Sequence, residues 1–104
     1  MRILFDQGAP APLRQSLTAH AVSTAFEMKW ERLENGKLLT AAEGAFDAFI
    51  TTDKNLRYQQ NLAGRRLAIL VLPTTSWREI EKHTDLISDT VNTLKPGDFI
   101  ELQI

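Results

Sequence analysis

Two aspartates in this sequence come at or shortly after the end of an apolar run. Residues 3–5 (Ile-Leu-Phe) come immediately before Asp6, and residues 48–50 lead through two threonines to Asp53. Short apolar runs of this kind are typical of buried strands. If the two strands are neighbours in a parallel sheet, both carboxylates face one crevice at the carboxyl ends of the strands, where α/β proteins bind ligands.

Two carboxylates in one crevice repel each other unless a positive charge lies between them. A divalent cation such as Mg²⁺ or Mn²⁺ would neutralise them, and both ions prefer hard oxygen ligands. An ion of this kind activates water or stabilises charge on a phosphate group. The competing interpretation is local: aspartate is a common turn former and N-cap, and Asp53 would then cap the helix after it.

Side chains suited to an RNA substrate lie near these aspartates in the sequence. The basic residues around the second one are Lys54, Arg57, Arg65 and Arg66. Such cations position phosphates, and Tyr58 could stack on a base. Gln7 and Asn35 are amides that could line the crevice, although Asn35 is equally suited to be an N-cap. The alternative for the basic residues is a solvated helix face.

The segments that must position these residues alternate between strands and helices. Strands are expected at 1–5, 20–26, 47–52, 66–72 and 99–104. Helices are expected from Pro12, from Asn35 to a stop at Gly44, and over 56–62. This alternation predicts a mostly parallel sheet of about five strands. Consecutive apolar residues in "ILF" and "LAILVL" require helices on both faces, which gives a three-layer α/β/α sandwich.

A long final helix is predicted after residue 75. Ser76 and Glu79 form an S-x-x-E capping box, and Pro96 and Gly97 stop the helix. From this box onward, the residues expected on the inward face recur at steps of three and four: Trp77, Ile80, Thr84, Ile87, Val91 and Leu94. One face of this helix should therefore pack against the sheet.

The totals restrict the class of protein. A chain of 104 residues fits a single domain, residues 1–104. It has no cysteine, which excludes disulfides, zinc–thiolate sites and thiol catalysis. A formal net charge of −1 argues against a large nucleic-acid surface while allowing a local one. The longest apolar run, 67–72, is too short to cross a bilayer, and no signal peptide is recognisable, so a cytoplasmic protein is predicted.

Three stretches together carry a resemblance that covers nearly the whole chain. They are "MRILFDQGAPAPLRQSL", "NGKLLTAAEGAFDAFITTDKNLRYQQNLAGRRLAILVL" and the "SW" before the last helix. The chain resembles a bacterial family of PIN-like proteins of unknown function. PIN domains are metal-dependent ribonucleases, often the toxin of a toxin–antitoxin pair, with a parallel α/β/α fold whose first strand is central. The resemblance implies Mg²⁺ or Mn²⁺, an RNA substrate and an antitoxin partner, and it leaves room for a homodimer.

The acidic residues of that family can be matched to positions in this chain. Asp6 corresponds to the acid after the first strand and Asp53 to the later "T-x-D" acid. Glu43, in "LLTAAEG", is the candidate for the middle catalytic acid, with a solvated helix position as the alternative. Asn55 stands where many PIN-like sequences carry a further acid, and its amide oxygen could bind a metal without adding charge.

Two other functions compete with a ribonuclease. One is a PIN-like binding or regulatory module without catalysis, which the amide at Asn55 favours. The number of carboxylates within reach of one ion separates these two: three or four favour a nuclease, and two favour binding. The other is a phosphoacceptor receiver domain, suggested by Lys95 and Pro96. It is disfavoured because receivers carry paired acids after the first strand and only Asp6 is present here.

Overall fold

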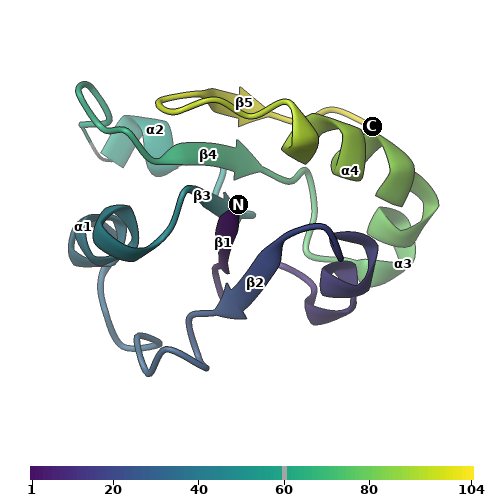
Figure 1. Cartoon of the computed structure of the whole chain (residues 1–104), viewed down its shortest axis with the longest axis horizontal. Coiled ribbons are helices and arrows are strands. Elements are labelled where there is room, and N and C mark those ends of the chain that lie inside the picture. Colours follow the sequence, from purple (N-terminus) through teal and green to yellow (C-terminus); the bar gives the residue numbers. More distant parts are fainter. Residues whose placement is uncertain (60) are drawn as a thin grey trace.

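The computed structural model describes residues 1–59 and 61–104, with the backbone alone at residues 35 and 59. Its centre is a five-stranded, wholly parallel sheet in the order β2-β1-β3-β4-β5 (Figure 1). The strands are β1 (Arg2–Phe5), β2 (Ala21–Thr24), β3 (Ala48–Thr51), β4 (Ala68–Val71) and β5 (Phe99–Glu101). The predicted parallel sheet is confirmed. β1 is an interior strand, and the middle position belongs to β3.

The apolar strand residues divide between two cores, one on each face of the sheet. Ile3 and Phe5 of β1 belong to one core and Leu4 to the other, and all three are fully buried. Successive side chains of a strand point to opposite faces, so an uninterrupted apolar run is stable only where both faces are covered. The same division recurs in β3 and β4, so both cores lie against the three middle strands, β1, β3 and β4.

Helices cover both faces, as the sequence predicts (Figure 1). One layer contains the 3-10 helix η1 (Ala11–Ser16), α3 (Trp77–Ile80), the 3-10 turn η2 (Glu81–His83) and α4 (Thr84–Asn92). The other contains α1 (Asn35–Ala45) and α2 (Leu56–Gln59). The fold is therefore a three-layer α/β/α sandwich. No helix in the parts of the chain that the structure describes is long and apolar enough to span a membrane.

Helix α1 differs from its prediction at both ends. Glu34 occupies the N-cap position without a side-chain hydrogen bond, and Asn35 is the first helical residue, so the prediction that Asn35 caps the helix is wrong. Gly44 lies inside the last turn and does not stop the helix. The helix ends instead where Phe46 turns extended (φ −132°, ψ 160°) and the chain enters β3.

The predicted long final helix is interrupted, although its buried face is correct. Ser76 is the N-cap, and its Oγ accepts a hydrogen bond from the Glu79 N–H at 3.4 Å. The expected return bond from the Glu79 side chain is replaced by Thr74, whose Oγ1 accepts from the Ser76 N–H. The turn η2 then separates α3 from α4. Ile80 and Ile87 are nevertheless fully buried on opposite sides of this break.

The buried face of α4 generates a prediction about stability. Ile87→Ala should lower the free energy of unfolding by about 2–5 kcal/mol, because it leaves a cavity in the core between α4 and the sheet. Its neighbour Leu86 is 43% exposed, so Leu86→Ala should change that free energy by about 0.5 kcal/mol or less. Denaturant unfolding measures both. Equal effects of the two substitutions would show that α4 packs through a different face.

Candidate metal and substrate site at the carboxyl edge of the sheet

The order of the strands brings the two aspartate-bearing ends together. From β1 the chain passes to β2 on one side of the sheet and later to β3 on the other. The order in which strands are added therefore reverses between β1 and β3, although all the strands are parallel. Phe5 of β1 is the register partner of Ile50 of β3. Asp6 and Asp53 therefore both lie at the carboxyl edge, at the switch point where open α/β sheets bind ligands. The predicted adjacency of the first and third strands is confirmed.

Asp6 is held by hydrogen bonds on three sides. Its N–H donates to the Ile50 carbonyl oxygen at 2.9 Å, which extends the pairing of β1 with β3 by one residue. Its Oδ1 accepts from the Gln7 N–H at 2.8 Å, and its Oδ2 accepts from the Thr51 hydroxyl at 2.9 Å. These contacts fix the direction of the Asp6 carboxylate at the end of the strand.

Thr51 links this carboxylate to the loop that carries Asp53. Its side chain is fully buried, and its Oγ1 also accepts from the Asp53 N–H at 3.1 Å. The Asp53 Oδ1 accepts from the Asn55 N–H at 3.0 Å, a local turn contact at the start of α2. Asp53 thus forms a turn before α2, but it is not the N-cap that the alternative interpretation proposed, because α2 begins at Leu56. This turn contact does not exclude a ligand, because a carboxylate has about four acceptor positions.

The two loops at this switch point are in close contact. A Cβ atom placed on Gly8 would lie 2.2 Å from the Thr52 Oγ1, far inside contact distance. Glycine is required here for space, so that the loop after β1 can lie against the loop after β3. The loop that follows Asp6 and the loop that carries Asp53 are therefore packed together.

Glu43, the predicted middle acid, lies at the amino ends of the strands, which is the end of the sheet opposite to the two aspartates. Its Oε1 accepts from the backbone N–H groups of Arg66 and Leu67, at 2.6 and 3.4 Å, just before β4 begins. Its Oε2 lies 3.6 Å from Arg65 Nη1. The structure thus does not bring Glu43 to the two aspartates. Among the described residues, no group of three or more histidine or acidic side chains is arranged to hold a metal ion.

Lys95, the lysine of the receiver-domain interpretation, also lies at that opposite edge. It precedes β5 and lines a cavity there together with Met1 and Arg66. A phosphoacceptor aspartate at the carboxyl edge would need its lysine at the same edge. The position of Lys95 therefore argues against a receiver domain.

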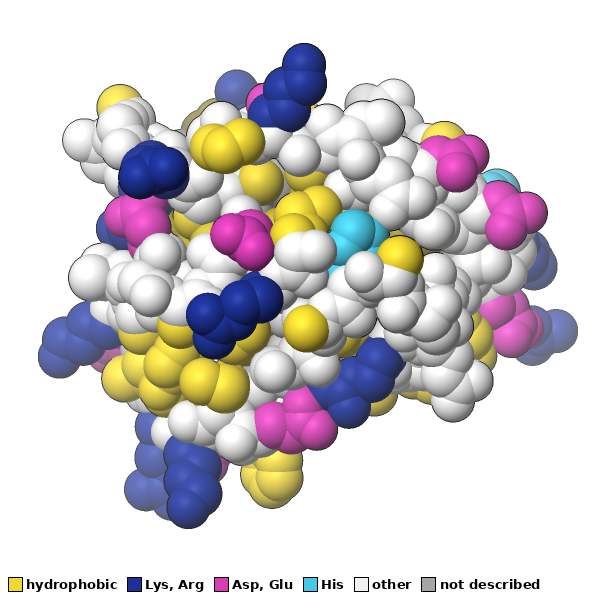
Figure 2. Space-filling model, in the orientation of Figure 1, with side chains coloured by type: hydrophobic (Ala, Val, Ile, Leu, Met, Phe, Trp, Pro, Cys, Tyr) yellow, Lys and Arg dark blue, Asp and Glu magenta, His cyan; other side chains and the backbone are white. Residues whose placement is uncertain are grey.

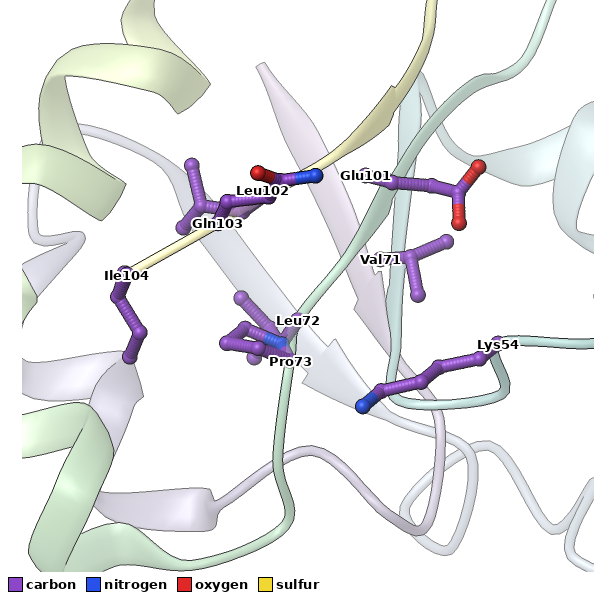
Figure 3. A pocket seen from close by; sticks show the side chains of 8 residues that line it. All are labelled: Lys54, Val71, Leu72, Pro73, Glu101, Leu102, Gln103 and Ile104. Atoms are coloured by element: carbon purple, nitrogen blue, oxygen red, sulfur yellow. The ribbon is translucent and has the colours of Figure 1, made fainter.

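The predicted substrate-binding cations lie in different surroundings. Lys54 extends from the loop after β3 toward Leu72 and Pro73, into a cavity of about 370 Å³ (Figure 3). Arg57 on α2 forms an ion pair with Glu101, with Nη1 and Oε1 2.6 Å apart. Arg57 is therefore neutralised, whereas Lys54 reaches a space large enough for an anion at the carboxyl edge.

The remaining predicted substrate residues are spread over a wider surface. Gln7 lines a second cavity beside Asp6, and its Nε2 donates to the Glu31 carbonyl oxygen at 3.2 Å. Tyr58 is 80% exposed on α2, with the Arg57 guanidinium 5.7 Å from its ring centre. The side chain of Asn35 lies outside the described residues, so its predicted role stays a prediction.

Phe26 is a candidate that the sequence did not single out. It is 72% exposed directly after β2, at the carboxyl edge, and lines the same cavity as Asp6. The sequence predicts Phe26 as the last residue of a second strand over residues 20–26, but β2 ends at Thr24. The Thr24-x-x-Glu27 spacing was a usable signal, because it is a capping box that ends the strand at Thr24 and turns Phe26 outward.

Charges of both signs are interspersed over the surface seen in Figure 2, where basic and acidic side chains alternate without a single large patch. This agrees with the formal net charge of −1. Any attraction for a phosphate must therefore come from individual cations at the carboxyl edge or from a bound metal ion.

The contact between Thr51 and Asp6 can be tested by a double-mutant cycle. Thr51→Val and Asp6→Ala should be coupled by about 1 to 3 kcal/mol in the free energy of unfolding, because either substitution removes the same partly buried, charge-assisted hydrogen bond. Thr40 is exposed on α1, where its hydroxyl donates to the Gly36 carbonyl oxygen, so the cycle of Thr51→Val with Thr40→Val should give a coupling within about 0.5 kcal/mol. Similar coupling in both cycles would refute the proposed link.

Comparisons of the chain with protein-family models, with curated proteins and with solved structures give no match. The resemblance to PIN-like proteins therefore rests on the sequence stretches that carry it and stays a prediction. What stands independently of it is an α/β/α fold with two aspartates at one switch point.

Proposed function

We propose that this protein is a PIN-like, divalent-metal-dependent phosphodiesterase that acts on RNA. The observation that carries the proposal is the placement of Asp6 and Asp53 after adjacent parallel strands, with the Thr51 hydroxyl bonded to both residues. The resemblance to PIN domains adds the reaction and the substrate class. The toxin role and the antitoxin partner stay predictions that depend on that resemblance.

The donor set suits a hard divalent cation. Mg²⁺ in such sites is commonly bound by one or two carboxylates, with water and substrate phosphates filling the other positions. The described contacts give each Asp6 carboxylate oxygen one hydrogen bond, which leaves each an acceptor position. Asp6 and Asp53 would hold the ion, with the Asn55 amide oxygen as a further neutral ligand. When bound, the cation would supply charge stabilisation at a phosphate and a more acidic water.

The protein's own side chains would hold and orient the substrate. The Thr51 hydroxyl donates to the Asp6 carboxylate and would hold it in place for the ion, and the loops of Gly8 and Thr52 lie against each other between the two aspartates. Lys54, one residue after Asp53, extends toward a neighbouring cavity and would bind a phosphate of the RNA backbone. No nucleophilic side chain is required for this chemistry.

A second candidate function is supported by the position of Glu43. Because Glu43 is bonded to the start of β4 at the other end of the strands, only two carboxylates of the predicted set are left for the proposed site. Fewer carboxylates weaken metal binding. This favours a PIN-like module that binds a metal ion and RNA without cleaving the RNA.

Metal binding tests the site directly. Asp53→Asn should weaken Mn²⁺ binding at least about tenfold, because it removes one of two charged ligands from a site with few others. It should leave the metal-free protein as stable or more stable, since Asn retains the oxygen that caps the turn and the two aspartates no longer repel each other. Isothermal titration calorimetry and thermal melting measure these two effects. Asp89→Asn, on the exposed side of α4, is the matched control and should alter neither.

Equal Mn²⁺ affinity in the wild type and Asp53→Asn would defeat the site. Cleavage is measured separately, by incubating a labelled RNA with Mn²⁺ or with a chelator. Metal-dependent cleavage that Asp53→Asn abolishes would support the phosphodiesterase. Metal binding at the site without cleavage would replace it by the non-catalytic module.

A further inference from the structure

A cavity of about 280 Å³ lies between Asp6 and the turn after β2. Its floor contains small apolar side chains, Ala9 and Ala25 among them, and its polar wall contains Asp6 and Gln7. Phe26 completes the lining and is 72% exposed. Asp6 is thus shared between the proposed metal site and this cavity.

The turn that carries Phe26 is tightly hydrogen-bonded, although the ring itself is exposed. The Thr24 N–H donates to Glu27 Oε1 at 2.9 Å, and the Glu27 N–H donates back to Thr24 Oγ1 at 3.0 Å. The Trp30 N–H closes the turn onto the Ala25 carbonyl oxygen at 2.8 Å. A ring presented on such a turn loses little conformational freedom when a ligand packs against it.

An ion pair fastens this turn to the helix on the other side of the cavity. Arg14 of η1 donates to both carboxylate oxygens of Glu27, through Nη1 to Oε2 at 3.1 Å and through Nη2 to Oε1. The hydrogen bond from Arg14, with the Thr24 backbone N–H second, lowers the pKa of Glu27 to about 2. The carboxylate is therefore charged at neutral pH, and the two walls of the cavity stay joined.

We propose that this cavity is a stacking subsite for one unpaired base of a single-stranded RNA, with the Phe26 ring as the platform. The inference rests on the proposed function and names the form of RNA that the site takes. Exposed apolar residues are common on protein surfaces. Phe26 differs because it stands on a hydrogen-bonded turn and lines a cavity shared with Asp6.

The side chains that line the cavity favour a base of the RNA over one of its phosphates. No lysine or arginine is among the described residues that line this cavity, so it offers a phosphate no cation, whereas a neutral, flat base can pack against the Phe26 ring and the alanine side chains. The volume is just below the usual range of small-molecule sites and suits a single base. Bases in a duplex are already stacked and paired, so single-stranded RNA is the form that can enter.

Fluorescence anisotropy with a labelled, mixed-sequence single-stranded RNA tests the subsite without reading cleavage. Phe26→Ala should weaken binding about 5- to 150-fold, the range for losing one base–aromatic stack. Phe26→Trp keeps an aromatic face and should bind within about threefold of the wild type. Leu86→Ala, which removes an exposed apolar side chain from α4, is the control and should bind as the wild type does. Thermal melting verifies that each variant is folded.

The outcomes separate the subsite from the proposed function. Loss in Phe26→Ala with retention in Phe26→Trp supports the subsite. If the wild type and Phe26→Ala bind the RNA equally, the subsite is wrong and the metal-dependent function stands. If the wild type prefers an RNA duplex of the same sequence, the subsite is wrong and the proposed function stands. If the wild type binds neither form of RNA, the subsite is wrong and the proposed substrate is wrong with it. A dimer in solution that Phe26→Ala dissociates would assign the ring to a protein interface and also overturn the subsite.

Discussion

The hydrogen bond from the buried Thr51 hydroxyl to the Asp6 carboxylate is the contact on which the proposed site depends. It joins the end of β1 to the end of β3, and the same oxygen receives the Asp53 N–H. Burying a hydroxyl is unfavourable unless it is hydrogen-bonded. Thr51 is buried, and its hydroxyl is satisfied by donating to Asp6 and accepting from the Asp53 N–H. The consequence is one rigid unit that carries both aspartates. The proposed metal site, the proposed phosphate position near Lys54 and the cavity lined by Phe26 all lie next to this unit.

Carboxylates have different roles at the two edges of the sheet. At the amino edge, Glu43 accepts from the backbone N–H groups that precede β4, and Asp47 accepts from the Arg2 N–H at 2.8 Å. These bonds satisfy donors at the starts of strands and thereby position the strands. At the carboxyl ends of the strands, Asp6 accepts from Gln7 and Thr51 and lines a cavity, and Asp53 accepts from the Asn55 N–H. This division explains why one acid of the predicted set takes no part in the candidate site.

The sheet and its covering helices could be predicted because they follow from local pattern. Uninterrupted apolar runs such as residues 3–5 require two covered faces, and the spacing of Ile80, Ile87 and Val91 identified the buried side of the last helices. The neighbouring positions of Asp6 and Asp53 were also correctly anticipated. The break at η2 could not be predicted, since the apolar spacing continues across it.

One failure depended on contacts between distant parts of the chain, and two were local. Glu43 has the sequence context of a catalytic acid, but its partners, Arg66 and Leu67, are more than twenty residues away in the sequence and become neighbours only in the fold. Phe26 was expected in a strand over residues 20–26, whereas the bonds between Thr24 and Glu27 end that strand at Thr24. Asn35 was a plausible cap by residue type, yet the helix begins one residue earlier than that role requires.

A crystal soaked in Mn²⁺ and measured for anomalous scattering tests the central claim most directly. The account predicts an anomalous peak between the Asp6 and Asp53 carboxylates, with metal–oxygen distances of about 2.1–2.3 Å, and no peak there in crystals of Asp53→Asn. A peak confined to another place, such as the carboxylates of the amino edge, or no peak when the crystals are saturated with Mn²⁺, would contradict it.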